Sequence, residues 1–76
     1  MSTDERVKRV MADVLEMSPA EISSKTTKEV TSTWDSLAQI NMASALEEEF
    51  DVSFTIADIE AMTSYDSIHA IVSRKL

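Results

Sequence analysis

The sequence predicts an all-α protein: a small four-helix bundle of three longer helices and one short helix, with a long loop between helices 1 and 2. Three segments carry apolar residues at helical spacing. Residues that favour helix starts precede these segments. The chain also has no Gly, which disfavours tight β-hairpins. Its 76 residues suffice for one domain, which we expect to span residues 1–76.

The first helix is predicted from a single apolar stripe. Its members recur at i, i+3, i+4, i+7 and i+8: Val7, Val10, Met11, Val14 and Leu15. Ser2 and Glu5 form a capping-box pattern at its start. The helix should end near Met17, because Pro19 disfavours helical geometry at the residue before it.

The loop that follows begins with a second capping-box pattern, Ser18-Pro19-Ala20-Glu21, which predicts one helical turn. Residues 23–33 are rich in Ser and Thr and show no apolar periodicity. We expect Ile22, Val30 and Trp34 to pin this loop to the core. Ordered loops of this length are uncommon and are often functional.

The second helix is predicted over residues 36–50. Its apolar face should comprise Leu37, Ile40, Ala43, Leu46 and Phe50, widened by Met42. Ser36 and Gln39 fit a capping box at its start. Glu47, Glu48 and Glu49 crowd its last turn, where the helix dipole opposes each exposed acid by ~0.3–1 kcal/mol. These acids are therefore either a solvated face or a docking surface for a partner.

The alternation from Val52 to Ile56 fits a short strand, but the chain offers no obvious partner strand. An extended loop that enters a short helix, capped by Thr55 with Asp58 three residues on, is the favoured interpretation. The last helix should start near Thr63 or Ser64. Its buried stripe is predicted as Tyr65, Ile68, Ile71, Val72 and Leu76.

Composition excludes several classes of function. The 14 acidic and 7 basic residues give a net charge of −7, which argues against nucleic-acid binding. With no Cys, one His (His69) and no metal-ligand spacing, we expect no metal site and no catalytic triad, and hence no enzyme. The absence of Gly excludes a Gly-rich nucleotide loop. No apolar run approaches the roughly 20 residues that span a bilayer, and the charged start resembles no signal peptide, so a cytoplasmic protein without membrane contact is expected.

Two serines stand in similar settings, Trp34-Asp35-Ser36-Leu37 and Tyr65-Asp66-Ser67-Ile68. Each serine could simply cap a helix, a role worth ~1 kcal/mol. Ser36 follows a long polar loop, so a partner enzyme could reach its hydroxyl, and the positive helix end would favour an attached phosphodiester. Ser67 lies within the first turn of a helix that already has a cap, which favours a structural role.

The stretch Asp35-Ser36-Leu37 followed by "AQINMASALEEEFDVSF" resembles acyl carrier proteins. The resemblance covers nearly the whole acidic chain. It implies that a separate phosphopantetheinyl transferase, usually with magnesium, attaches 4′-phosphopantetheine from coenzyme A to Ser36. Asp35 would be the neighbour of Ser36 in the transferase complex, and Leu37 would anchor the helix start. The thiol of the arm carries acyl groups as thioesters, which suits a chain without Cys.

Some residues depart from the carriers of fatty acid synthesis. Thr33 and Trp34 stand where those carriers have Leu-Gly and an aliphatic residue, and Ala38 and Asn41 replace acids. The resemblance is therefore nearest to discrete carriers of polyketide or other specialised pathways. Peptidyl and D-alanyl carriers remain alternatives, as does, from another class, a small acidic helical adaptor without a prosthetic group.

The resemblance also implies partners and a place for the cargo. A monomer is expected to meet the transferase and the enzymes that load and process acyl groups, such as a ketosynthase, an acyltransferase or a ligase. Basic patches on these enzymes would meet Glu47, Glu48 and Glu49. An acyl pocket is expected among Leu46, Phe54, Ile59, Met62 and Ile68. Because Phe54 and Met62 are bulky, this pocket should shelter a short chain at most.

Overall fold

The computed structural model describes residues 2–76; Met1, the first residue of the predicted domain, lies outside the described residues. Its helices are α1 (Thr3–Leu15), the 3₁₀ turn η1 (Pro19–Glu21), α2 (Ser36–Phe50), α3 (Ile56–Glu60) and α4 (Tyr65–Lys75). Within residues 2–76 there is no β-strand, only an isolated bridge between Thr27 and Ser64. The predicted fold of three longer helices and one short helix is confirmed.

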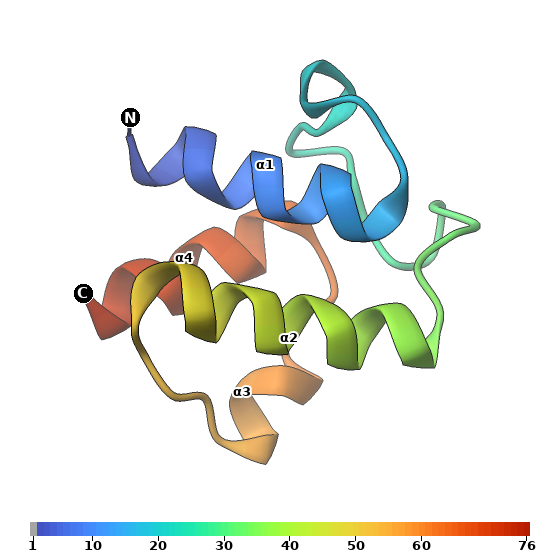
Figure 1. Cartoon of the computed structure of the whole chain (residues 1–76). Coiled ribbons are helices and arrows are strands. Elements are labelled where there is room, and N and C mark those ends of the chain that lie inside the picture. The colour runs from blue at the N-terminus through green and yellow to red at the C-terminus, as the bar shows by residue number, and fades with distance from the viewer. Residues whose placement is uncertain (1) are drawn as a thin grey trace.

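Helix α1 packs against both α2 and α4, while α3 contacts α2 (Figure 1). The long loop after η1 leads directly into the start of α2 (Figure 1). The side chains that are fully buried come from α1, α2, α4 and the connector before α4: Val7, Met11, Leu15, Met42, Leu46, Met62, Ile68 and Val72. These residues form one core cluster, which fixes the three longer helices relative to one another.

The helix ends follow the predicted capping chemistry in most places. Ser2 accepts a hydrogen bond from the Glu5 N–H, and Ser18 and Glu21 form a reciprocal capping box. Thr55 and Asp58 form another at the start of α3, as predicted. The chain has no Gly, so Glu16 and Asp51 adopt the left-handed conformation that ends α1 and α2, with φ of 58° and 54°.

The buried face of α2 differs from the prediction. Leu37 and Ile40 are 66% and 62% exposed, and Ala38 is buried instead, whereas the predicted members Met42, Ala43, Leu46 and Phe50 are buried as expected. The predicted stripe advanced in steps of three residues, and each such step falls 60° short of a full turn of an α-helix. The observed stripe runs back from Leu46 toward the first turn of α2 in steps of four residues. It therefore passes through Met42 and Ala38.

Two further residues predicted to be buried are exposed. Val30, in the long loop, is 73% exposed, and Leu76, beyond the end of α4, is 65% exposed. The loop is instead held by the buried Ile22, Thr26 and Trp34. Backbone hydrogen bonds also tie it to the connector before α4, from Lys28 N to Thr63 O at 2.8 Å and from Tyr65 N to Thr26 O at 2.9 Å. The loop is thus fixed by contacts with a distant segment of the chain.

Candidate functional site

Helix α2 is capped by Asp35 and not by Ser36. The Asp35 carboxylate accepts a 2.8 Å hydrogen bond from the Ala38 N–H, and Ser36 is the first residue of the helix. The predicted capping box of Ser36 with Gln39 is therefore wrong. Asp and Ser are about equally favoured as N-cap residues. With Asp35 in that position, α2 does not need the Ser36 hydroxyl as a cap.

Because Asp35 caps α2, the Ser36 side chain has no structural role at the helix start. Ser36 is exposed, and its hydroxyl has no hydrogen-bond partner among residues 2–76. It stands on the first turn of a 15-residue helix, where the positive end of the helix dipole favours a negatively charged group. A nucleophilic oxygen is thus presented to solvent at a place suited to a phosphodiester.

Ser67, the other serine of the paired motifs, is fully engaged. Its hydroxyl accepts hydrogen bonds from the N–H groups of Thr63 and Ser64, both at 3.1 Å, and donates to the Ser64 carbonyl at 3.0 Å. Ser64 is the N-cap of α4 and Ser67 completes the capping box. The structural interpretation of Ser67 is confirmed, and of the two predicted helix starts, Thr63 and Ser64, it is Ser64 that caps α4.

A hydrogen-bond network brackets Ser36 on both sides. The buried Trp34 donates from its indole Nε1 to Gln39 Oε1 at 2.6 Å. Gln39 in turn donates from Nε2 to the carbonyls of Ile59, at 2.6 Å, and Met62, at 2.8 Å. The network joins the loop before Ser36, the first turn of α2 and the end of α3. Sequence reasoning missed this role of Gln39, because its acceptors lie 20 and 23 residues away.

Leu37 does not anchor the helix start. Its side chain is mostly exposed, like that of Ile40 one turn further along α2. The helix start is anchored by Ala38, which is buried, and by the Trp34–Gln39 contact. The prediction that Leu37 packs into the core is therefore wrong, and the residue instead adds apolar surface next to Ser36.

The five residues of the predicted acyl pocket lie in one cluster. Leu46, Met62 and Ile68 are fully buried, and Phe54 and Ile59 are half-buried against the same core. They come from α2, α3, α4 and the connectors on either side of α3. A guest in this region would therefore have to enter the core between α2, α3 and α4.

Two of the three acids at the end of α2 have partners within the fold. Glu47 accepts a 2.8 Å hydrogen bond from the Phe54 N–H. Glu49 pairs with Arg6 at 2.8 Å, and Arg6 also donates to the Glu49 carbonyl at 2.6 Å while its guanidinium lies over the Phe50 ring. Glu48 is exposed and has no such contact among residues 2–76. The premise that all three acids lack a use inside the fold is wrong for Glu47 and Glu49.

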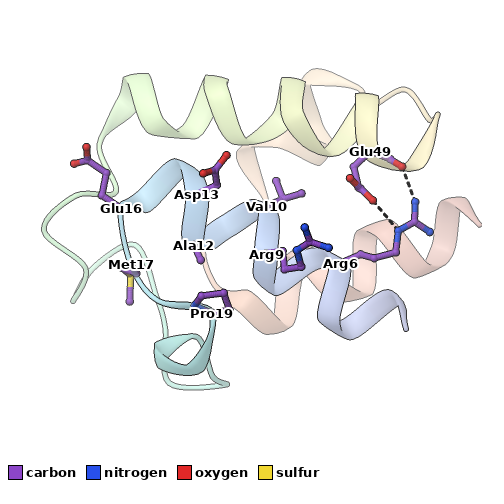
Figure 2. Close-up of a pocket in the computed structure, with 9 residues that line it drawn as sticks. All are labelled: Arg6, Arg9, Val10, Ala12, Asp13, Glu16, Met17, Pro19 and Glu49. Carbon is purple, nitrogen blue, oxygen red and sulfur yellow. Dashed lines mark hydrogen bonds and ion pairs between the residues drawn. The ribbon is translucent and has the colours of Figure 1, made fainter. Parts of the chain in front are cut away.

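An open groove of about 660 Å³ runs along α1 and the turn after it (Figure 2). Basic residues, Arg6 and Arg9, and acidic residues, among them Asp13 and Glu16, line it together. Glu49 is the one predicted site residue among those drawn in Figure 2. The groove is therefore separate from the start of α2.

Helix α3 is fastened to the end of α4 by Asp58. Its carboxylate meets Arg74 at 2.6 Å and Lys75 at 3.0 Å, and its side chain is only 12% exposed. The backbone N–H of Thr55 also donates to it at 3.0 Å. This backbone hydrogen bond, followed by the contact with Lys75, holds the pKa of Asp58 well below its ordinary value of 3.8. The carboxylate is thus a charged tie between the two helices.

None of the helices within residues 2–76 combines the length and apolar character needed to cross a membrane. The fold is similar to the solution NMR structure of a holo acyl carrier protein from Geobacter metallireducens. The TM-score is 0.83 at 19% sequence identity, and the match covers 99% of this chain and 86% of that one. This likeness supports the helical arrangement described above.

Residues 5–74 match the model of the family described as "Phosphopantetheine attachment site". The match spans all four helices and the long loop. It decides between the two classes that the sequence left open, a carrier with a prosthetic group and an adaptor without one. The chain therefore belongs to the phosphopantetheine attachment site family, as a carrier that bears covalent 4′-phosphopantetheine and is not itself an enzyme.

Proposed function

We propose that Ser36 is the residue that bears the 4′-phosphopantetheine arm. The observation that carries this proposal is the contrast between the two serine hydroxyls. The Ser36 hydroxyl is exposed and unpaired among residues 2–76, whereas the Ser67 hydroxyl is held by backbone groups on three sides. Arm attachment at Ser36 costs the fold no hydrogen bond.

The surroundings of Ser36 suit a phosphodiester. In the transfer, Ser36 Oγ loses its proton and forms a new O–P bond to the phosphate that carries the pantetheine. The P–O bond to the bridging oxygen of the coenzyme A pyrophosphate breaks, and the nucleotide part leaves with that oxygen. The base must come from the transferase, because the single His of the chain lies on α4 against the Tyr65 ring. One Asp35 oxygen caps α2, which leaves the second to face a metal ion or a donor of the transferase.

We propose that the exposed residues around Ser36 contribute to recognition by partner enzymes. Leu37 and Ile40 offer apolar surface on the first turns of α2. Glu48 offers an exposed negative charge near the other end of the helix, with Glu47 and Glu49 beside it. At 1.5 Å per residue, Glu48 lies roughly 18 Å along the axis from Ser36. A transferase, ketosynthase, acyltransferase or ligase could therefore hold the acids while its active site receives the arm.

The proposed role is that of one cytoplasmic carrier domain, monomeric, for acyl thioesters of polyketide, fatty acid or related specialised biosynthesis. Trp34 supports a specialised pathway, because it is buried where carriers of fatty acid synthesis have an aliphatic residue and is tied to Gln39. The cargo would enter among the five pocket residues, Leu46, Phe54, Ile59, Met62 and Ile68. Three of them, Leu46, Met62 and Ile68, are already fully buried in the core, which supports a short chain.

A loading assay tests this proposal. The purified chain is incubated with coenzyme A, magnesium and a broad-specificity transferase, and its intact mass is followed. The holo form is then loaded with acyl groups of increasing length, and its melting temperature is measured. A short-chain carrier gains stability from the first few carbons at up to ~0.8 kcal/mol per buried CH₂ and then stops gaining. A steady rise through long chains would contradict the small pocket, and aminoacyl loading alone would favour a peptidyl or D-alanyl carrier.

A further inference from the structure

We infer that Gln39 is a positioning residue for arm attachment, which links the turn that presents Ser36 to helix α3. This inference rests on the proposed attachment at Ser36. Gln39 lies one turn into α2 and is half-buried. Its side chain reaches back to the loop before Ser36 and across to the end of α3.

The Gln39 amide uses both of its N–H donors and one of the two lone pairs of its oxygen. The oxygen accepts from the Trp34 indole at 2.6 Å, and the nitrogen donates to the carbonyls of Ile59 and Met62 at 2.6 and 2.8 Å. An amide is the neutral side chain that can satisfy this set. A carboxylate would repel the two carbonyls, and an aliphatic chain would leave buried groups unpaired.

On the loop side, the contact fixes the residues that enter α2. Trp34 is 3% exposed, and its backbone N–H is held by the Thr31 carbonyl at 3.0 Å. It is followed directly by the Asp35 cap and then by Ser36. The Trp34–Gln39 hydrogen bond therefore closes a loop of chain around Ser36, with one end on each side of the attachment turn.

On the other side, Gln39 is one of the few ties that hold α3. This five-residue helix contains no buried residue. Ile59 is only half-buried against the core, and polar contacts add to its packing: Gln39 at the C-terminal end of α3, Glu47 before its start and Asp58 to the end of α4. Any displacement of the end of α3 must break the Gln39 hydrogen bonds, and so it would loosen the turn at Ser36.

The test compares Gln39→Met, which keeps the volume and removes the amide, with the unaltered chain in the transferase assay. Without the network the transferase must order the turn as it binds, so the loss should appear as a higher KM with kcat little changed. The loss of a hydrogen bond to a buried group should raise KM about five-fold. Trp34→Phe removes the indole donor together with part of the buried ring. The double variant should raise KM no further than Gln39→Met, because both changes break the same hydrogen bond.

Val72→Ala serves as the control, since Val72 is fully buried on α4 and lies away from the attachment turn. It should lower the melting temperature without raising KM at a temperature where the chain is folded. Hydrogen exchange adds a second measurement: in Gln39→Met it should accelerate together at the N–H groups of Ala38 and Met62, on the two elements that Gln39 joins.

A Gln39→Met variant with the KM of the unaltered chain would overturn the inference while leaving Ser36 as the attachment site. So would a rise in KM that Val72→Ala matches at equal loss of stability. If Gln39→Met does not fold, the KM of Trp34→Phe is compared with that of the unaltered chain, and an unchanged KM would overturn the inference. An arm found on another residue of the unaltered chain would overturn both the proposed function and this inference.

Discussion

The carboxylate of Asp35 accepts a 2.8 Å hydrogen bond from the backbone N–H of Ala38, and so it occupies the capping position that the sequence pattern also offered to Ser36. The two adjacent residues therefore have different roles. Asp35 completes the start of α2, and Ser36 keeps a free hydroxyl there. The hydroxyl of Ser36 is therefore available at a helix start whose cap is provided by another side chain.

Substitutions of Asp35 and of Ser36 should have different effects on the free energy of unfolding. Asp35→Ala removes the cap and should lower the free energy of unfolding by about 1 kcal/mol, within the usual range of ~0.5–2 kcal/mol. Asp35→Asn keeps an acceptor and should restore most of the loss. Ser36→Ala should change stability little, since the hydroxyl has no partner among residues 2–76. Urea unfolding of the three variants checks this, and an equal loss in Ser36→Ala and Asp35→Ala would contradict this difference in roles.

Ser67→Ala should behave in the opposite way to Ser36→Ala. Its hydroxyl receives two backbone N–H groups at the start of α4, and their loss should lower the free energy of unfolding by ~1–3 kcal/mol. Arm transfer to the folded variant should proceed at the normal rate. Thermal unfolding and the transfer assay, run on the same sample, provide the two readouts. A variant as stable as the unaltered chain would show that these contacts contribute nothing.

The Asp58 tie predicts a specific response to acid. Because its pKa in the folded chain is lower than its ordinary value of 3.8, its contribution to stability is fully present above that pH and is lost as pH falls below it. Asp58→Asn should be less stable than the unaltered chain at pH 7 and should lose less stability between pH 5 and pH 2. Denaturant unfolding at several pH values checks this. Parallel curves for both proteins would show that the contacts with Arg74 and Lys75 carry no net stabilisation.

Reversing the charge of Glu47 and of Glu48, at the end of α2, should affect stability differently. Glu48→Lys should leave stability unchanged or slightly raised, since a cation suits a helix C-terminus. It should also slow association with a basic partner at low salt. Glu47→Lys should in addition lower stability, because the Phe54 N–H loses its acceptor. Reversing both charges should therefore lower stability through Glu47.

The measurement is the arm-transfer rate against ionic strength for each single variant, alongside its melting temperature. Each exposed pair is worth only ~0.2–1 kcal/mol, so the effect of Glu48→Lys should be a few-fold and should vanish at high salt. A Glu48→Lys chain that is modified at the normal rate at low salt would show that this acid is a solvated face and not part of a docking surface.

Local patterns in the sequence were sufficient for much of the fold. The Thr55–Asp58 capping box, the turn at Pro19 and the start of α1 depend on residues within one helical turn, and each was found as predicted. The prediction for the first half of the buried stripe of α2 is wrong, because that half carries apolar residues on both faces of the helix. Leu37 and Ile40 are as hydrophobic as Met42, and only the packing of α1 and α3 against α2 selects the side that is buried.

The family motif indicates Ser36 as the candidate attachment site, and its position remains a prediction. The surroundings of Ser36 could not be predicted in full, because the sequence does not decide which of two adjacent good capping residues, Asp35 or Ser36, caps α2. The contacts of Gln39 with Ile59 and Met62, and of Arg6 with Glu49, join residues that lie 20 to 43 positions apart. No local pattern encodes such pairs, because they depend on how the helices pack.

The central claim is that Ser36, and not Ser67, receives the arm. The most direct test is peptide mapping by mass spectrometry after incubation with coenzyme A, magnesium and a transferase, on the unaltered chain and on the Ser36→Ala and Ser67→Ala variants. The account predicts one added 4′-phosphopantetheine on the peptide that contains Ser36, the same addition in Ser67→Ala and none in Ser36→Ala. An arm that persists in Ser36→Ala, or that maps to the peptide containing Ser67, would contradict it.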